Sequence, residues 1–316
     1  MLATLMADRR RRLAAAALRG LLAALAALAA CDPAPAPAPS SAAPTASAFP
    51  PPQTTVDTTP AAVVAEPAGP RSPSNPLGLP PRRIKLDPGR RVFTFSDRML
   101  ASARPGSTLV LYAATVVGFD GDDLIIEGRG GPSYKVHPGY VIPVPDAPRV
   151  RLHEPALTEW NGAMKHAVVT RFVKDRIAVR YTDMDARTPE ALLKDVRFVP
   201  QTEGLAPGNY AAQKEGDEWR HVLLVSRLGE GNPGQWFALG YGGAARIVDE
   251  TALRPIPIRA AKIKAGSAVW AEWVGSLRRA TVQSVDEVGF FTVKFERAGR
   301  PVRVGWGLIT PPLEGG

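Results

Sequence analysis

The stretch AGSAVWAEWVGSLRRATVQSVDEVGFFTVKFE, Ala265–Glu296, alternates short apolar runs with polar breaks. The runs RATVQSV and GFFTVKFE are rich in Val, Phe and Thr, which fit a pleated strand better than a helix. Gly275 and the segment Asp286–Gly289 supply turn residues between the runs. The stretch therefore predicts short strands joined by tight turns.

The same pattern of short apolar runs separated by turn residues continues along most of the chain from about Ile84 onward. Turn residues recur roughly every 8–12 residues, which is the pattern of an all-β protein. The runs are TLVLYAATVVGF, DDLIIEG, HAVVTRF, DRIAVRYTD, HVLLVSRLG and QWFALGYG. One short helix is expected at Thr188–Val196, where Thr188 can cap and Pro189 suits the first helical position.

The runs also repeat at long range. Four windows share one order of features. Each begins with a glycine or Pro-Gly, continues with an apolar run, an Ala/Val-rich strand and a further strand, and ends in a proline. The windows span residues 105–145, 157–200, 205–257 and 264–312. Their Ala/Val strands start at Ala114, Ala167, Val222 and Ala280, with spacings of 53, 55 and 58 residues. These spacings predict four units, at residues 82–148, 149–203, 204–260 and 261–316. Two β-sandwiches built from the same strands are the alternative.

The last unit resembles the Tudor/Agenet branch of SH3-like barrels. The pattern G-x-x-V-x-A-x-W-x-G followed by A-x-V is matched by Gly266, Val269, Ala271, Trp273, Gly275, Ala280 and Val282, and the closing residues by Leu308, Ile309 and Pro311. The second unit keeps Trp160, Gly162 and Ala167, and the third keeps Gly208, Gly216 and Trp219. The first lacks the W-x-G turn. The resemblance implies tandem small barrels and leaves function open.

The N-terminus has the three parts of a secretory signal peptide, residues 1–30. Arginines at Arg9–Arg12 and Arg19 precede the ten Leu/Ala residues Leu21–Ala30. A ten-residue helix reaches only about 15 Å, half of a bilayer's hydrocarbon core. A retained transmembrane helix is the alternative, but extending the run to Leu13 places Arg19 within it.

The residues Leu28-Ala29-Ala30-Cys31 resemble the lipobox of bacterial lipoproteins, and Cys31 is the chain's one cysteine. The resemblance implies cleavage before Cys31 and a diacylglycerol joined to its sulfur by a thioether. It usually also implies an acyl chain, such as palmitate, on the new amino terminus. The expected location is a lipid-anchored protein of the cell envelope facing the periplasm. Asp32 resembles an inner-membrane retention signal, which leans toward the inner membrane and leaves the choice of membrane open.

Residues 31–81 are expected to form a disordered Pro/Ala-rich linker, because 15 of the 32 prolines fall between Pro33 and Pro81. The net charge is +9, of which the signal peptide holds four. The remaining basic balance suits an acidic polymer or an anionic surface, but dispersed Lys and Arg on the surface of soluble strands is the commoner interpretation. An exported chain is not expected to meet nucleic acid.

The resemblance implies an aromatic cage for a methylated cation. The aromatic candidates are Trp270, Trp273, Phe290 and Phe291 in the last unit, and Tyr210, Trp219, Trp236 and Tyr241 in the third. Arg278 and Arg279 stand where a further cage aromatic is common, and a guanidinium there repels a cation. The milder hypothesis is a surface that holds glycan or peptide by stacking and carboxylate pairing. Packing of these rings in barrel cores is the alternative.

The sequence contains few of the residue patterns that indicate an enzyme. The four histidines, His137, His153, His166 and His221, lack zinc spacing, and no nucleophile, P-loop or dinucleotide motif is present. Asp120–Asp123 and Asp183–Asp185 are more typical of turns than of a metal site. We expect no enzyme, cofactor or metal. The sequence favours a non-catalytic, lipid-anchored envelope protein for binding or scaffolding. A peptidoglycan- or glycan-binding accessory module of an envelope enzyme complex is the first alternative, and a small hydrolase the second.

Overall fold

The computed structural model describes residues 70–128, 130–182, 190–194, 197–228, 234–258, 263–297 and 299–313. The predicted signal peptide, Cys31 and most of the predicted linker lie outside these residues. None of the helices in the described part of the chain has the length and apolar character needed to cross a membrane.

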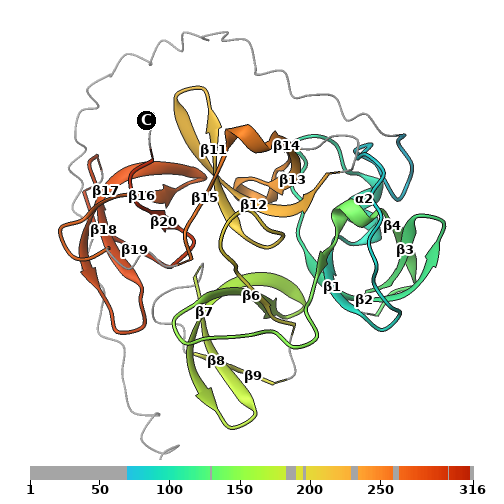
Figure 1. The fold of residues 1–316 in the computed structure, drawn as a ribbon, viewed down its shortest axis with the longest axis horizontal. Coiled ribbons are helices and arrows are strands. Elements are labelled where there is room, and N and C mark those ends of the chain that lie inside the picture. The colour runs from blue at the N-terminus through green and yellow to red at the C-terminus, as the bar shows by residue number, and fades with distance from the viewer. Residues whose placement is uncertain are drawn as a thin grey trace, which may run out of the picture. The chain divides into compact units, whose positions relative to one another are not determined.

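The described chain forms four Tudor-like units of five strands each. In Figure 1 the labelled strands of each unit lie together, following one another along the colour bar. Unit 1 has β1 (Arg91–Thr94), β2 (Tyr112–Asp120), β3 (Asp123–Glu127), β4 (Tyr134–Val136) and β5 (Ile142–Pro143). Unit 2 has β6 (Pro155–Trp160), β7 (Ala163–Val173), β8 (Arg176–Tyr181), β9 (Ala191–Leu193) and β10 (Val199–Pro200). Unit 3 has β11 (Tyr210–Glu215), β12 (Glu218–Arg227), β13 (Gln235–Leu239), β14 (Ala245–Asp249) and β15 (Leu253–Pro255). Unit 4 has β16 (Ala268–Trp273), β17 (Ser276–Val285), β18 (Phe291–Phe295), β19 (Val302–Val304) and β20 (Ile309–Thr310).

One pairing scheme is common to all four units. The first four strands pair in sequence, and the fifth strand returns to the free edge of the first, all antiparallel. This return curls each five-stranded ribbon toward a small barrel, which confirms the all-β, Tudor-like prediction. The helical pieces are short and connect strands: α2 (Asp97–Ala101), η1 (Pro138–Tyr140), η2 (Tyr241–Gly243) and η3 (Glu250–Ala252).

Each unit carries a β-bulge at the same place in its second strand. The register shifts fall at Val116/Gly118, Val169/Arg171, Leu224/Ser226 and Val282/Ser284. Successive bulges are 53, 55 and 58 residues apart, which are the spacings of Ala114, Ala167, Val222 and Ala280. Because a bulge bends and twists its strand, the repeat in sequence is also a repeat of the bend that curls the sheet.

The second strands join the units in pairs. β2 of unit 1 pairs with β7 of unit 2 at Tyr112↔Ala163, and β12 of unit 3 pairs with β17 of unit 4 at Arg220↔Ser276. We call Ala114, Ala167, Val222 and Ala280 the Ala/Val positions of units 1 to 4. In both pairs the residue from the odd-numbered unit lies two residues before its Ala/Val position, and the residue from the even-numbered unit lies four before its own. We call units 1 and 2 the first module and units 3 and 4 the second module. The described part of the chain is therefore two copies of one two-barrel module, each held by a ten-stranded sheet.

The W-x-G turn of units 2 and 4 helps to set this junction. Asn161-Gly162 have φ of 51° and 86°, and Val274-Gly275 have φ of 51° and 82°. Positive φ at both central residues is the signature of a type I′ hairpin turn, which matches the twist of the strands it joins. Gly162 O and Gly275 O then accept hydrogen bonds from the neighbouring unit, at 2.8 Å from Ala113 N and 2.9 Å from His221 N.

Units 1 and 3 also share a core. Phe237 of unit 3 packs edge-to-face on Phe95 and Tyr140 of unit 1, with ring centroids 6.0 and 5.3 Å apart. The hydroxyl of Ser226 donates to Gly139 O at 2.6 Å across the same contact. Burial of each large apolar side chain stabilises the fold by about 1.5–3 kcal/mol, so this shared core binds the two modules into one body.

The predicted linker ends earlier than residue 82, which corrects the predicted boundary. Leu77 and Leu79 are buried in the core of unit 1. Asn75 holds this segment, because its amide donates to Leu79 O at 2.8 Å and its Oδ1 accepts from Leu79 N at 2.8 Å. The Tyr140 hydroxyl donates to the same Oδ1 at 3.1 Å. Leu77, Leu79 and Asn75 thus help to anchor a segment whose average composition is that of a linker.

The helix expected at Thr188–Val196 is wrong for the part that the structure describes. Ala191–Leu193 form β9 and pair with β8 at Ile177↔Leu193. A neighbouring strand offers hydrogen bonds that outweigh weak local helix propensity. A helix that was not predicted, α2, begins after Ser96, whose hydroxyl accepts from Met99 N at 3.4 Å.

Adjacent glycines at the contact between units 1 and 3 allow a matched test. Gly243 has φ of 83°, and a Cβ there would lie 2.2 Å from Leu109 O; Gly242 has φ of 65° and open space around it. We expect Gly242→Ala to cost about 1–2 kcal/mol, the ordinary penalty of left-handed backbone. Gly243→Ala should cost at least about 2 kcal/mol more, because it also forces two backbones apart. Urea unfolding of both variants measures the difference, and equal costs would contradict this contact.

Candidate functional site

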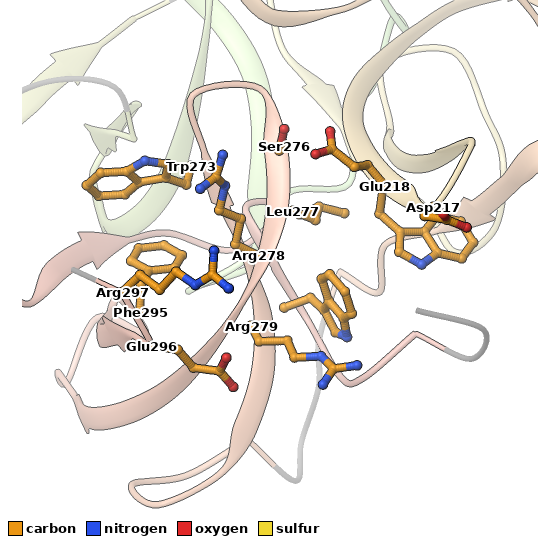
Figure 2. A pocket seen from close by; sticks show the side chains of 12 residues that line it. Asp217, Glu218, Trp273, Ser276, Leu277, Arg278, Arg279, Phe295, Glu296 and Arg297 are labelled. Atoms are coloured by element: carbon orange, nitrogen blue, oxygen red, sulfur yellow. The ribbon is translucent and has the colours of Figure 1, made fainter. Parts of the chain in front are cut away.

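A groove of about 460 Å³ lies on the second module, where units 3 and 4 meet. We call it the tryptophan groove. Its lining consists of Asp217, Glu218, Trp219, Trp270, Trp273, Ser276, Leu277, Arg278, Arg279, Phe295, Glu296 and Arg297. Figure 2 shows β17 passing between Trp273, Phe295 and Arg297 on one side and Asp217 and Glu218 on the other.

Strand register explains how these residues meet. Trp270 lies opposite Arg279 across β16 and β17, and Ala271 lies opposite Arg278. Trp219, at the start of β12, lies opposite Leu277 in the pairing that joins units 3 and 4. The groove therefore follows the seam of the module, and neither unit alone contains it.

The three tryptophans differ in how they are held. Trp219 is buried with Leu277, Ala212 and Ile256 in a small cluster between the units. Trp270 packs against that cluster but keeps part of its surface exposed. Trp273 makes an edge-to-face contact with Phe295, with ring centroids 4.9 Å apart.

Cations of the protein already lie near two of these rings. The Arg279 guanidinium is 5.6 Å from the centroid of Trp270, and Lys214 Nζ is 5.1 Å from that of Trp219. Arg278 and Arg297 add positive charge to the lining, while Asp217, Glu218 and Glu296 add negative charge. A methylated cation would meet like charge here, which disfavours a cation cage. The mixed lining suits a ligand that carries both a flat face and a carboxylate.

The structure brings together five of the nine predicted binding residues: Trp219, Trp270, Trp273, Arg278 and Arg279. Phe291 is buried in the core of unit 4, where its ring centroid lies 4.7 Å from that of Trp306. Phe290 is also buried, beneath the guanidinium of Arg303 at 3.7 Å. Trp236 is buried in the core of unit 3.

Tyr241 is 64% exposed and lies apart from the groove, beside a second cavity. This central cavity of about 550 Å³ is lined by residues from all four units. At its wall the rings of His166 and Tyr210 are stacked, with centroids 3.9 Å apart and planes 24° apart. The ring centroid of His221 lies 4.2 Å from that of Tyr210, with the two planes tilted by 48°.

Sequence reasoning missed this histidine–tyrosine–histidine stack, which joins units 2 and 3. The repeat carried a signal for it, because His166 and His221 both directly precede the Ala/Val position of their units. Arg279 occupies the same position in unit 4, and Ala113 in unit 1. The equivalence of these four positions becomes informative only when the units are known to face one another.

Both imidazoles of the stack are kept neutral. Burial lowers the pKa of His221 to about 4, although the contact of its Nε2 with Gly307 O at 2.8 Å works in the opposite direction. Burial also lowers the pKa of His166 well below its ordinary value, and the nearby His221 and Lys165 lower it further. The Nε2 of His166 is shielded from solvent and has no hydrogen-bond partner among the described residues.

No metal-binding grouping is evident in the described part of the chain. Its histidine, aspartate and glutamate side chains include no group of three or more that could hold a metal ion. In the first acidic cluster Asp120 pairs with Lys135, and Asp123 accepts from Ser74 Oγ at 2.5 Å. The second cluster, Asp183–Asp185, lies outside the described residues.

Comparison with known proteins gives a likeness of fold only. No family model matches the chain, and no curated protein does. Among solved structures it is similar to the four MBT repeats of Drosophila melanogaster Sfmbt, solved in complex with the peptide RHR(me)KVLR. The identity is 10%, the match covers 72% of this chain and 88% of that chain, and the TM-score is 0.16. At this TM-score the likeness carries no conclusion about ligands.

The histidine stack makes stability depend on pH. Because the folded pKa of His221 lies below its unfolded value of about 6.5, the unfolded chain binds more protons between these values. This stability is fully present above about pH 6.5 and is lost as pH falls toward 4. Between pH 7 and pH 5 the loss from His221 alone is roughly 2 kcal/mol.

Urea unfolding at the two pH values measures this loss, and His221→Gln should reduce it by most of that amount. Glutamine keeps a donor that can reach Gly307 O but does not titrate. An unchanged pH dependence in the variant would show that His221 is not held neutral in the folded protein.

Proposed function

We propose that this chain is a non-catalytic, lipid-anchored protein of the bacterial cell envelope that binds or scaffolds partners through its tandem barrels. The observation that carries the binding part is the tryptophan groove, where three tryptophans and three arginines line one depression across a seam. A peptidoglycan- or glycan-binding accessory role in an envelope enzyme complex is the alternative, and it would use the same groove.

The chemistry of the groove supports a flat or carboxylate-bearing ligand. A volume of about 460 Å³ lies in the range of sites for small molecules and short peptide segments. Exposed indole faces bind sugar rings and planar groups, and guanidinium groups bind carboxylates in a bidentate manner. Fragments of peptidoglycan present both sugar rings and peptide carboxylates, so they are the first ligands to test.

The anchor part of the proposal rests on sequence. A basic leader, a ten-residue Leu/Ala run and the lone Cys31 occur in the order of a lipoprotein signal. Two or more acyl chains on Cys31 hold a protein stably at a membrane, whereas one chain does so only marginally. The envelope location, with the choice of membrane open, follows from the same reasoning.

Purified peptidoglycan provides the test of the groove. We expect the full chain in detergent to sediment with it, and Trp270→Ala to weaken binding at least tenfold, because it removes the partly exposed ring beside Arg279. Trp160→Ala is the matched control, since Trp160 occupies the position of Trp273 in unit 2 and lies outside the groove. Circular dichroism verifies folding of each variant. Equal binding by all three proteins would rule out the groove, and no binding would rule out this ligand.

Metabolic labelling with palmitate tests the anchor. The native chain should incorporate label and fractionate with membranes, while Cys31→Ala should do neither, because the thiol that carries the lipid is gone. Ser40→Ala, within the predicted linker, serves as the control and should behave as the native chain. A Cys31→Ala protein that is still labelled and membrane-bound would overturn the lipoprotein assignment.

A further inference from the structure

Each unit has one side chain at the rim of its barrel, two residues before the Ala/Val position of its second strand. These rim residues are Tyr112, Lys165, Arg220 and Arg278 in units 1 to 4. Alternate residues of a strand point to the same side of a sheet, so each rim residue extends from the face that carries the buried Ala/Val position. All four are at least partly exposed, which places them at the boundary between core and solvent.

In unit 3 the rim cation is neutralised by neighbouring acidic residues. Arg220 Nε lies 3.1 Å from Glu215 Oε2, and its Nη2 lies 2.8 Å from Glu218 Oε2. Its Nη1 also donates to Ser276 Oγ at 2.7 Å. The guanidinium of this rim therefore has its partners within the protein.

In unit 4 the rim cation faces a second cation instead. β17 and β18 pair at Ala280↔Phe295, and the same register, continued by two residues along each chain, sets Arg278 opposite Arg297. Both arginines are exposed and line the tryptophan groove. Figure 2 shows both on the side of β17 that carries Trp273 and Phe295. Among the described residues neither guanidinium has an ion pair or a hydrogen bond.

Unit 2, the other even-numbered unit, has opposite charges at the corresponding two positions of its sequence. Its strands β7 and β8 pair at Ala167↔Tyr181. Lys165 lies two residues before Ala167. Asp183, which is outside the described residues, comes two residues after Tyr181. Unit 2 thus has a cation and an anion in its sequence where unit 4 has two arginines.

Two unneutralised guanidinium groups on neighbouring strands are suited to share one anion. Like charges directly opposite each other across strands destabilise a sheet, and a bound anion removes that cost. Guanidinium groups bind carboxylate and phosphate oxygens in a bidentate manner. A phosphate monoester carries a charge of about −1.5 to −2 at pH 7, so one such group matches both arginines. A single carboxylate or a phosphodiester matches only one of them.

We propose that Arg278 and Arg297 form an anion clamp at the rim of unit 4, which holds the phosphate monoester of a phosphorylated sugar in the tryptophan groove. The inference rests on the proposed function, since it requires the groove to be a binding site, and it names the class of ligand.

The rest of the groove fits the sugar of such a ligand. Trp273 is partly exposed on the same side of β17 as the clamp, so its ring is a flat surface close to the phosphate site. Asp217 and Glu296 also line the groove, and among the described residues neither has an ion pair. Carboxylates accept hydrogen bonds from hydroxyl groups but repel further negative charge. A ligand with one anionic end and a neutral, hydroxylated body therefore fits better than an acidic peptide.

Glucose 6-phosphate is the probe, titrated by calorimetry into the full chain in detergent at low salt. We expect saturable binding, with glucose itself weaker by about tenfold or more. Arg278→Ala and Arg297→Ala should each weaken binding of glucose 6-phosphate by about tenfold or more, because each removes half of the clamp. Arg300→Ala is the matched control, an exposed change in unit 4 outside the groove, and should bind as the native chain does. Circular dichroism verifies folding of each variant.

Arg297→Asp adds a measurement that needs no ligand. It gives unit 4 the opposite charges that unit 2 has in its sequence, so it should abolish binding of glucose 6-phosphate. At low salt and without ligand it should also raise the urea midpoint of unfolding above that of the native chain, because a repulsion becomes an attraction. Arg300→Asp is the control and should not raise it. An Arg297→Asp midpoint at or below the native one would show that the two arginines do not repel each other, which contradicts the clamp.

Four other results would overturn the inference. They are the absence of saturable binding, equal binding of glucose and glucose 6-phosphate, native binding by both alanine variants of the clamp, and equal weakening by Arg300→Ala. The last would assign the binding to the overall positive charge. Vesicles of phosphatidylcholine with phosphatidate test a lipid as the source of the phosphate. Vesicle binding that needs both arginines, without binding of glucose 6-phosphate, would assign the clamp to a membrane surface and overturn the sugar ligand.

The proposed function is judged separately. If peptidoglycan binds in a Trp270-dependent manner while glucose 6-phosphate does not bind, the clamp fails and the proposed function stands. If glucose 6-phosphate binds through both arginines and peptidoglycan does not bind, the clamp holds and peptidoglycan is excluded as the ligand. If neither binds, both fail.

Discussion

The structure depends on one backbone contact, the antiparallel pairing of second strands between neighbouring units. A five-stranded ribbon that curls only partly leaves backbone donors and acceptors at its edges, and these must find partners. In both modules, the backbone N–H of the residue before the Ala/Val position of the odd-numbered unit donates to the carbonyl of the glycine in the W-x-G turn of the even-numbered unit. His221 N to Gly275 O, at 2.9 Å, is one of the two bonds. This contact places unlike units at one fixed angle and register, and every seam residue follows from it.

The corresponding surfaces of the two modules share a backbone arrangement but have different neighbours, so one is packed and the other is a groove. In the first module the seam faces unit 3, and Tyr210 lies between His166 and His221 at the central cavity. In the second module the matching surface bears larger rings and a guanidinium and forms a groove. The two modules thus keep one backbone framework but differ in the side chains that precede the Ala/Val positions, so one face is packed and the other is a groove.

The polar groups at the two sites behave differently for a physical reason. At the centre, burial disfavours the charged form of the imidazoles, so the stack is uncharged and is compatible with close ring contact. At the groove, the side chains of Arg278 and Arg279 are exposed beside the indole rings. The central junction is therefore packed and neutral, whereas the groove has exposed arginines of the same framework.

Local chemistry determined what could be predicted from the sequence. Runs of β-branched and aromatic residues between turn residues indicate strands, and the recurring Ala114, Ala167, Val222 and Ala280 mark the second strand of each unit, because strand and turn preferences act over a few residues. Tertiary packing alone decided that Phe291 and Trp236 are core while Trp270 is partly exposed, since the three look alike in sequence and differ in their neighbours. It also decided that Leu77 and Leu79 fold with unit 1 and that Ala191–Leu193 form a strand. Burial and pairing depend on residues far away along the chain, so no local pattern contains them.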